Sequence, residues 1–208
     1  FRSYFNWLLD NINGYIPIMY EYAEGFRLKP YSKLLATIPI PINTQKKPNL
    51  NENDKIIFFH GLTRERIKGS LLVKEAFDEL RIKYKDVADF IVEGYMPYRD
   101  YISLFETVDV VVDQIYSVSL GVNGVLGLSK GKVVVGGGEI EFLKEFNLNE
   151  SPIVSIEPNV EDIKRKLIGL IERKDELLKI KKASYDLAVS LHDEGVVATK
   201  YMSTWNEL

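Results

Sequence analysis

Residues 55–69 read KIIFFHGLTRERIKG, an apolar run that passes into a basic turn. The run Lys55–Phe59 is rich in Ile and Phe and predicts a buried strand, after which the turn His60–Gly69 begins. A second junction follows where Asp109–Ile115 leads into a glycine turn, residues 117–124, and then an apolar run with helical spacing. Two strand-to-helix junctions, one with cations and one with glycines, indicate a site for a diphosphate.

Strands and helices alternate along the rest of the chain. Short β-branched runs alternate with runs of helical period, which predicts an α/β fold with a parallel sheet covered by helices on both faces. The expected strands are 55–59, 88–93, 110–114, 132–135 and 153–156, and the expected helices are 68–84, 98–106, 121–128, 140–146, 160–173, 175–191 and 195–206. We expect helix 68–84 to pack on the sheet through the face that holds Leu71, Leu72, Phe77 and Leu80.

Composition excludes several classes of function. The chain has 208 residues with a net charge of −3, which argues against a general nucleic-acid surface. It has no Cys and two distant histidines, so thiolate chemistry is excluded and a His-based metal site is not expected. No apolar run approaches the roughly 20 residues that span a bilayer, and we expect a cytoplasmic protein.

The domain organisation is read from the prolines between residues 38 and 49, which oppose a helix and indicate a connector. We expect a first segment at 1–43, a linker at 44–54, a ligand-binding domain at 55–194 and a C-terminal helix at 195–208. The chain starts at Phe1 with an amphipathic segment and without Met, from which we expect that another half precedes it.

The two junctions supply the candidate groups for an anion. Arg64, Arg66 and Lys68 would provide positive charge, and the backbone N–H groups of Gly121–Gly124 would point at the ligand from a helix N-terminus. The alternative interpretations are a solvated basic turn and glycines that serve turn geometry alone.

Further candidates lie at the ends of other strands. The triplet Gly136–Gly138, followed by Glu139, would let the backbone approach a ligand closely, or it is a plain flexible turn. Asp113 and Gln114 could bind a sugar, although we favour a role in holding the next loop. His60 could serve a ligand or be a satisfied structural residue. No Ser-His-Asp triad can be assembled, so the chain is richer in binding groups than in catalytic ones.

The order of these motifs resembles the C-terminal, nucleotide-sugar-binding half of a group 1 family glycosyltransferase with two Rossmann-like domains, the GT-B fold. The resemblance covers about residues 55–205. The matching motifs are Gly61, Arg64 and Lys68-Gly69; Glu75-Ala76-Phe77; Ile91–Gly94; Asp109–Asp113; Ser119–Gly121; and Gly131–Val134.

This resemblance implies transfer of a sugar from a nucleoside diphosphate sugar, such as a UDP-sugar, to a saccharide or lipid-linked saccharide acceptor, without a metal or other cofactor. It also implies a retaining reaction in bacterial surface or capsular polysaccharide synthesis, with the enzyme in the cytoplasm or at the inner face of the membrane. The implied diphosphate site is made of Gly61, Arg64, Arg66, Lys68, Leu120, Gly121, Val122 and Asn123, and the base, ribose and sugar would lie near Glu93, Gly94, Tyr95, Gln114 and Glu139.

The chain departs from the family at its usual pair of glutamates, which fall here on Val118 and Leu126. Gln114, Asn123 or Glu139 would have to replace their contacts. The basic turn is also one residue longer than usual, which makes Arg66 an alternative to Arg64.

The resemblance implies that segment 1–43 is the tail of the N-terminal half, with residues 14–19 as its last strand, and that helix 195–206 packs back on it. The acceptor site would lie mostly on that other half, so this fragment alone should be inactive in transfer. Two alternatives stay open, a noncatalytic domain of the same fold and a nucleotide-sugar epimerase.

Overall fold

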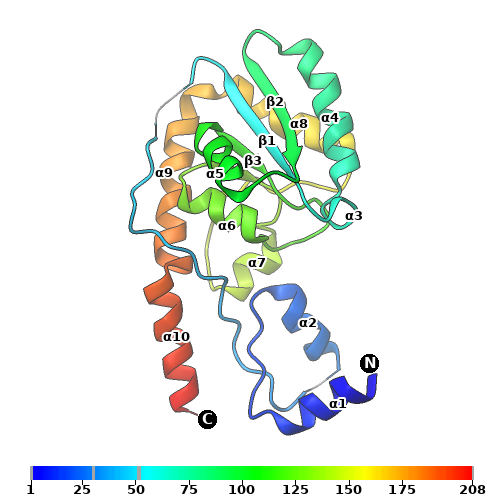
Figure 1. Ribbon diagram of the computed structural model, residues 1–208, viewed down its shortest axis with the longest axis vertical. Coiled ribbons are helices and arrows are strands. Elements are labelled where there is room, and N and C mark those ends of the chain that lie inside the picture. The colour runs from blue at the N-terminus through cyan, green and yellow to red at the C-terminus, as the bar shows by residue number, and fades with distance from the viewer. Residues whose placement is uncertain (1, 30, 51–52, 208) are drawn as a thin grey trace.

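The computed structural model describes residues 2–29, 31–50 and 53–207. In this part of the chain, four parallel strands form one sheet in the order β2-β1-β3-β4 (Figure 1). They are β1 (Ile56–Leu62), β2 (Ala88–Gly94), β3 (Val110–Val112) and β4 (Val133–Val135). The predicted α/β class with a parallel sheet is confirmed. The expected linker includes Asn51 and Glu52, which lie outside the described residues.

The register of the sheet sorts side chains onto two faces. Phe58 pairs with Phe90 and Val110, and Val110 pairs with Val133. This first face packs against α4 (Ser70–Lys83) and α8 (Val160–Glu172).

The second face, which holds Phe59, Val111 and Val134, packs against α5 (Tyr98–Thr107), α6 (Val122–Ser129) and α9 (Leu177–Leu187). Helices thus cover both faces, and every residue of β3 and β4 is buried.

The first junction differs from the predicted one. β1 continues through His60 and Gly61, which we placed in the turn. The expected helix 68–84 is interrupted by Gly69, so that a short helix, α3 (Glu65–Lys68), precedes α4. Gly69 has a φ of 73°, and a Cβ there would lie 2.7 Å from the Cβ of Ile115, so the chain needs glycine at this bend.

The predicted apolar face of the following helix was wrong in part. Leu71 is 76% exposed, whereas Val73 and Ala76 are fully buried with Phe77 and Leu80. The bend at Gly69 sets the rotation of α4, which helical period alone does not determine.

Two predicted strands are not formed in the described residues. Residues 153–156 make a single parallel bridge, between Val154 and Val135. Residues 14–19 likewise contribute one bridge, between Tyr15 and Leu34. Pro17 lacks the N–H that a longer ladder would require there, although its carbonyl accepts from the Ile38 N–H at 2.9 Å.

The C-terminal helices follow the prediction with one interruption. The expected helix 175–191 is divided into a 3₁₀ turn (Lys174–Glu176), α9 and a π-helical turn (Ala188–His192). The last helix, α10 (Glu194–Asn206), extends away from the sheet (Figure 1). No helix in the described ranges combines the length and the apolar character that crossing a bilayer would require.

The N-terminal segment forms a separate small lobe beside α7 (Ile140–Glu145) in Figure 1, built from α1 (Arg2–Asn11) and α2 (Tyr20–Leu28). Arg27 of α2 donates two hydrogen bonds of 2.7 Å to the Glu145 carboxylate at the end of α7. This fork connects the lobe to the helix that follows β4.

Candidate functional site

A groove opens at the carboxyl edge of the sheet between β1 and β3. The chain leaves β1 toward the face of α4 and leaves β3 toward the face of α6, so the two connections diverge at this point. Such a switch point is where open α/β sheets bind ligands. The groove is lined by Thr63, Arg64, Ile67, Lys68, Gln114, Gly121, Val122 and Asn123.

The two arginines of the basic turn are separated by the local backbone. Arg64 lies in the groove, at the start of α3, with a left-handed φ of 52°. Arg66 lines a neighbouring hollow with Glu65, Leu71 and Tyr116. Both side chains are exposed, and within the described residues neither forms an ion pair. Arg64 is therefore the free cation that the groove offers to an anion.

Lys68 is not a free cation. Its Nζ lies 3.1 Å from Oδ1 of Asp113, and both side chains are buried. The other carboxylate oxygen of Asp113, Oδ2, accepts from the backbone N–H groups of Gly121 at 2.8 Å and Gly124 at 3.1 Å. Asp113 thus joins the basic turn to the glycine turn, which agrees with the structural role that we favoured for it.

The N-terminus of α6 keeps two open donors. Gly121 has an extended backbone before the first helical residue, and its own N–H is taken by Asp113. Among the described residues, no hydrogen-bond partner is found for the N–H groups of Val122 and Asn123. These two amides, at the positive end of the helix dipole, can stabilise an anion in the groove.

His60 is a structural residue. It is fully buried in β1, where its Nδ1 donates to the Val112 carbonyl at 2.8 Å and its Nε2 accepts from the Ser70 hydroxyl at 2.7 Å. Burial lowers the pKa of His60 to about 4, so the imidazole is neutral at pH 7. Both ring nitrogens are satisfied within the fold, and neither is left for a ligand.

The side chains that lie over Gly61 leave no space for a larger residue at this position. A Cβ at this position would lie 2.6 Å from the Tyr101 hydroxyl and 2.9 Å from Nδ2 of Asn123. Burial raises the pKa of Tyr101, and the nearby Asp113 carboxylate adds to the increase, so the hydroxyl stays protonated. Tyr101 was not predicted, because nothing in its helical surroundings distinguishes it from a core aromatic.

The residues predicted to contact the base, ribose and sugar do not all line the groove. Gln114 lines the groove. Glu93 and Gly94 pair with Gly61 and Leu62, so the loop after β2 is next to the basic turn, but these residues do not line the groove. Tyr95, 80% exposed, begins that loop.

The glycine triplet after β4 approaches the protein's own backbone. A Cβ on Gly136, which has a φ of 99°, would lie 2.5 Å from the Gln114 carbonyl oxygen. Gly137 meets the backbone of Ser119 in the same way. Glu139 follows as the residue before α7 and does not line the groove. The triplet therefore shapes the loop after β3.

No protein-family model matches this sequence, and no curated protein does. Solved structures do match, at low identity. TarM is 15% identical with a TM-score of 0.73, over 97% of this chain and 45% of TarM. Anabaena HepE in complex with UDP and glucose is 13% identical with a TM-score of 0.72, over 100% of this chain and 66% of HepE. A variant of S. aureus TarM in complex with Fondaparinux, alpha-GlcNAc-glycerol and UDP is 14% identical with a TM-score of 0.74, over 95% of this chain and 45% of that protein.

This chain has the fold of the C-terminal half of a GT-B glycosyltransferase. It spans about half the length of TarM.

In this GT-B half, the two positions of the expected glutamate pair are apolar and structural. Leu126 packs against the buried cluster of Phe59, Phe105 and Val111. The carbonyl of Val118 accepts from the Glu139 N–H at 3.3 Å. Of the three replacements that we considered, Gln114 and Asn123 line the groove and Glu139 does not.

A carboxylate reaches the loop around Val118 from a distant part of the chain. Glu21 of α2 accepts from the Ser119 N–H at 2.9 Å and also from the Ser117 hydroxyl. Burial raises the pKa of Glu21, but the hydrogen bonds from Ser117 and Ser119 outweigh this and hold it below its usual value. Glu21 was not predicted, because nothing local marks a surface helix residue that caps a loop almost a hundred positions away.

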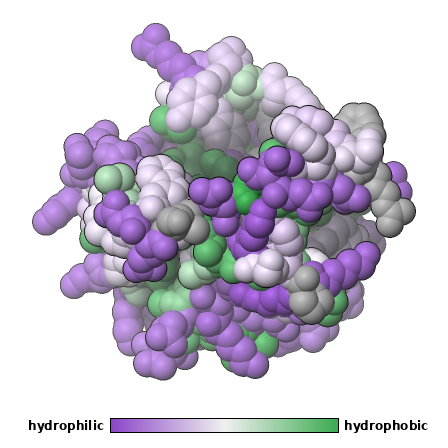
Figure 2. Space-filling view, turned by 90° about the horizontal axis from the view of Figure 1, so that it is seen from below, coloured by the Kyte–Doolittle hydropathy of each residue, from purple (hydrophilic) through white to green (hydrophobic). Residues whose placement is uncertain are grey.

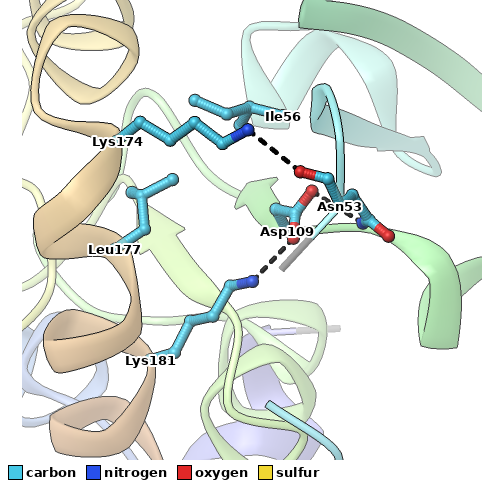
Figure 3. A pocket seen from close by; sticks show the side chains of 6 residues that line it. All are labelled: Asn53, Ile56, Asp109, Lys174, Leu177 and Lys181. Carbon is cyan, nitrogen blue, oxygen red and sulfur yellow. Dashed lines mark hydrogen bonds and ion pairs between the residues drawn. The ribbon is translucent and has the colours of Figure 1, made fainter. Parts of the chain in front are cut away.

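A second hollow lies at the opposite edge of the sheet (Figure 3). Its polar groups bond to one another. Asp109 accepts from Lys181 Nζ at 2.6 Å and from Asn53 Nδ2 at 2.9 Å, and Lys174 donates to the Asn53 carbonyl at 3.0 Å. Within the described residues, no group of three or more His, Asp or Glu side chains could hold a metal ion.

Proposed function

We propose that this chain is the donor-binding half of a glycosyltransferase that transfers a sugar from a nucleoside diphosphate sugar to a saccharide acceptor. The observation that carries the proposal is the groove at the switch point, which is lined by both an unpaired arginine and the open amides of a helix N-terminus. The fold supports it, because HepE and the TarM variant were both crystallised with UDP. A UDP-sugar is therefore the first donor to test.

The proposed chemistry is stabilisation of the leaving diphosphate. Negative charge develops on the phosphate oxygens as the bond from the sugar to the diphosphate breaks. Arg64 would pair with these oxygens through its planar fork, and the Val122 and Asn123 amides would donate to them. Preorganised donors of this kind act without a metal, which is how we propose that the enzyme works.

The stereochemistry, the acceptor and the cellular location depend on more than the groove. We propose a retaining reaction in cell-surface or capsular polysaccharide synthesis, with an acceptor that binds mainly to an N-terminal half. A saccharide acceptor is supported by the alpha-GlcNAc-glycerol and Fondaparinux in the TarM variant. We further propose a cytoplasmic enzyme, peripheral at the inner face of the membrane, where a lipid-linked saccharide would be available.

Calorimetric titration of the chain with UDP, GDP and ADP tests the donor site. We expect saturable binding of UDP that Arg64→Ala weakens about tenfold to a hundredfold, the scale of a charge-assisted hydrogen bond. Alanine keeps the Cβ that Arg64 already carries in its left-handed backbone, so the variant changes charge without changing strain.

Lys83→Ala is the control, because Lys83 is exposed at the far end of α4. Equal losses in Arg64→Ala and Lys83→Ala would argue against the groove, and the absence of binding by every nucleotide would overturn the donor site. Lys68→Ala is a poorer test than Arg64→Ala, since it leaves the buried Asp113 without its counter-ion.

A noncatalytic domain of the same fold is the second candidate. It is favoured by the apolar residues Val118 and Leu126, which offer no carboxylate to a ribose or a sugar. Binding of UDP-glucose without hydrolysis or transfer, when the chain is joined to a catalytically competent N-terminal half, would support this candidate. Sugar transfer by the same protein would exclude it.

A further inference from the structure

Asp113 places a negative charge between the basic turn after β1 and the glycine turn after β3. The residue is fully buried, and its carboxylate contacts Lys68 through Oδ1 and the Gly121 and Gly124 amides through Oδ2. Within the described part of the chain, the hydrogen bonds of this carboxylate thus come from groups that flank the groove. The protein's own anion already uses one cation and two helix N-terminal donors.

The donors left for a ligand are fewer than the sequence indicates. Lys68 is balanced by Asp113, so the free positive groups of the groove are Arg64 and the amides of Val122 and Asn123. A phosphate that approached Lys68 would meet a carboxylate at hydrogen-bond distance from that ammonium. Like charges held close together in a partly buried site repel strongly.

We propose that Asp113 is a specificity-determining residue, an internal anion that limits the negative charge accepted by the groove. It directs a bound diphosphate away from Lys68 and onto Arg64 and the Val122 and Asn123 amides. This inference rests on the proposed donor site. It differs from a purely structural role, in which Asp113 only holds the two turns together and its loss would weaken every nucleotide alike.

The test is calorimetric titration of the wild-type chain and Asp113→Asn with uridine, UMP and UDP at one salt concentration. The asparagine keeps an oxygen for the glycine amides and removes the charge. We expect at least tenfold tighter binding of UDP, a smaller gain for UMP and no change for uridine, because the repulsion grows with ligand charge. Asp113→Ser, a second neutral replacement, should show the same order.

Two controls separate this effect from a change in net charge. Asp89→Asn removes an exposed carboxylate at the start of β2, 3.4 Å from Lys55, and should leave all three affinities unchanged. Lys68→Met combined with Asp113→Asn removes both charges of the buried pair, and should return UDP affinity to within about threefold of wild type, as expected for coupled neighbours.

Each other outcome contradicts the inference. If the wild type binds UDP and the neutral variants bind it equally or more weakly, Asp113 does not limit charge, and the donor site stands. If neither neutral variant folds cooperatively, Asp113 is a structural residue. If no variant binds any nucleotide while all of them fold, both the inference and the donor site fail.

Discussion

Burial decides the role of each titratable side chain in this GT-B half. His60 was a candidate ligand-binding residue, but the fold surrounds it and bonds both its ring nitrogens. His192 is also buried, and its Nδ1 donates to the Ile40 carbonyl at 2.8 Å. Burial lowers the pKa of each histidine to about 4, well below the ordinary value of 6.5. Both histidines are therefore neutral in the folded protein at pH 7.

These two histidines predict a loss of stability in mild acid. Between pH 6.5 and about 4 the unfolded chain binds protons that the folded chain does not, so stability is full above pH 6.5 and falls as the pH is lowered. Over that window each histidine should lower the free energy of unfolding by roughly 3 kcal/mol. Urea denaturation at a series of pH values measures the slope.

The variant His60→Asn provides the comparison. Asparagine can donate to Val112 and accept from Ser70 without titrating, so the loss between pH 6.5 and 4.5 should fall by about half. An unchanged slope in this variant would show that His60 is not the group responsible.

Helices and strands are joined at the opposite edge of the sheet by a second buried ion pair. Asp109, just before β3, accepts from Lys181 of α9 and from Asn53 (Figure 3). It also accepts from the Ile57 N–H at 2.9 Å. The pair holds α9 against the sheet far from the groove. Its contribution belongs to the packing of elements and not to ligand binding.

Asp109→Asn should lower the free energy of unfolding by about 3 to 5 kcal/mol, because it removes the buried carboxylate charge that lies 2.6 Å from the Lys181 ammonium. Chemical denaturation measures the change. Asp78→Asn, which removes the exposed partner of Arg81, should cost less than about 1 kcal/mol.

The paired replacement of Asp109 by Leu and Lys181 by Met should cost less than Asp109→Asn alone, since it removes both charges together. A double variant that is less stable than the single one would contradict this explanation.

The whole molecule depends on contacts between its two ends and the sheet domain. Glu21 caps the loop after β3, the Arg27 fork holds Glu145, and the Ile42 N–H donates to the His192 carbonyl at 2.8 Å at the base of α10. Seen from below, this end of the molecule is mostly hydrophilic, with hydrophobic residues showing between the polar ones (Figure 2). Trp7 and Trp205, on α1 and α10, are each more than half exposed.

Arg27→Ala should release the N-terminal lobe without unfolding the sheet. Burial raises the pKa of Glu145, but the hydrogen bonds from Arg27 and Thr37 outweigh it and hold the pKa below its usual value. Removing the guanidinium leaves this carboxylate under-bonded, so the amides of residues 15–38 should exchange at least tenfold faster with deuterium.

Exchange in β1, β3 and β4 should stay at its wild-type rate. Arg173→Ala, which removes an exposed pair with Glu176, should change neither region. Uniform acceleration over the whole chain in Arg27→Ala would show that the lobe and the sheet unfold together.

The local sequence pattern predicted the order of strands and helices and the edge of the sheet at which the groove lies. The alternation of β-branched and helical-period runs predicted four of the strands and most helices, because strand and helix periods are properties of neighbouring residues. Arg64, Gln114, Gly121, Val122 and Asn123 line the groove, because the two connections that hold them leave neighbouring parallel strands at the same edge of the sheet. Their binding of a donor stays a prediction.

What only the tertiary structure decided is how the charged groups are paired. The pairing of Lys68 with Asp113 joins residues on two different connections, and Glu21 reaches a loop after β3 from the N-terminal lobe. The bend at Gly69 rotates α4 so that Leu71 faces solvent. Burial and counter-charge arise from contacts between residues far apart in the chain, so composition and spacing located the cations while the packed fold determined which of them is free to bind an anion.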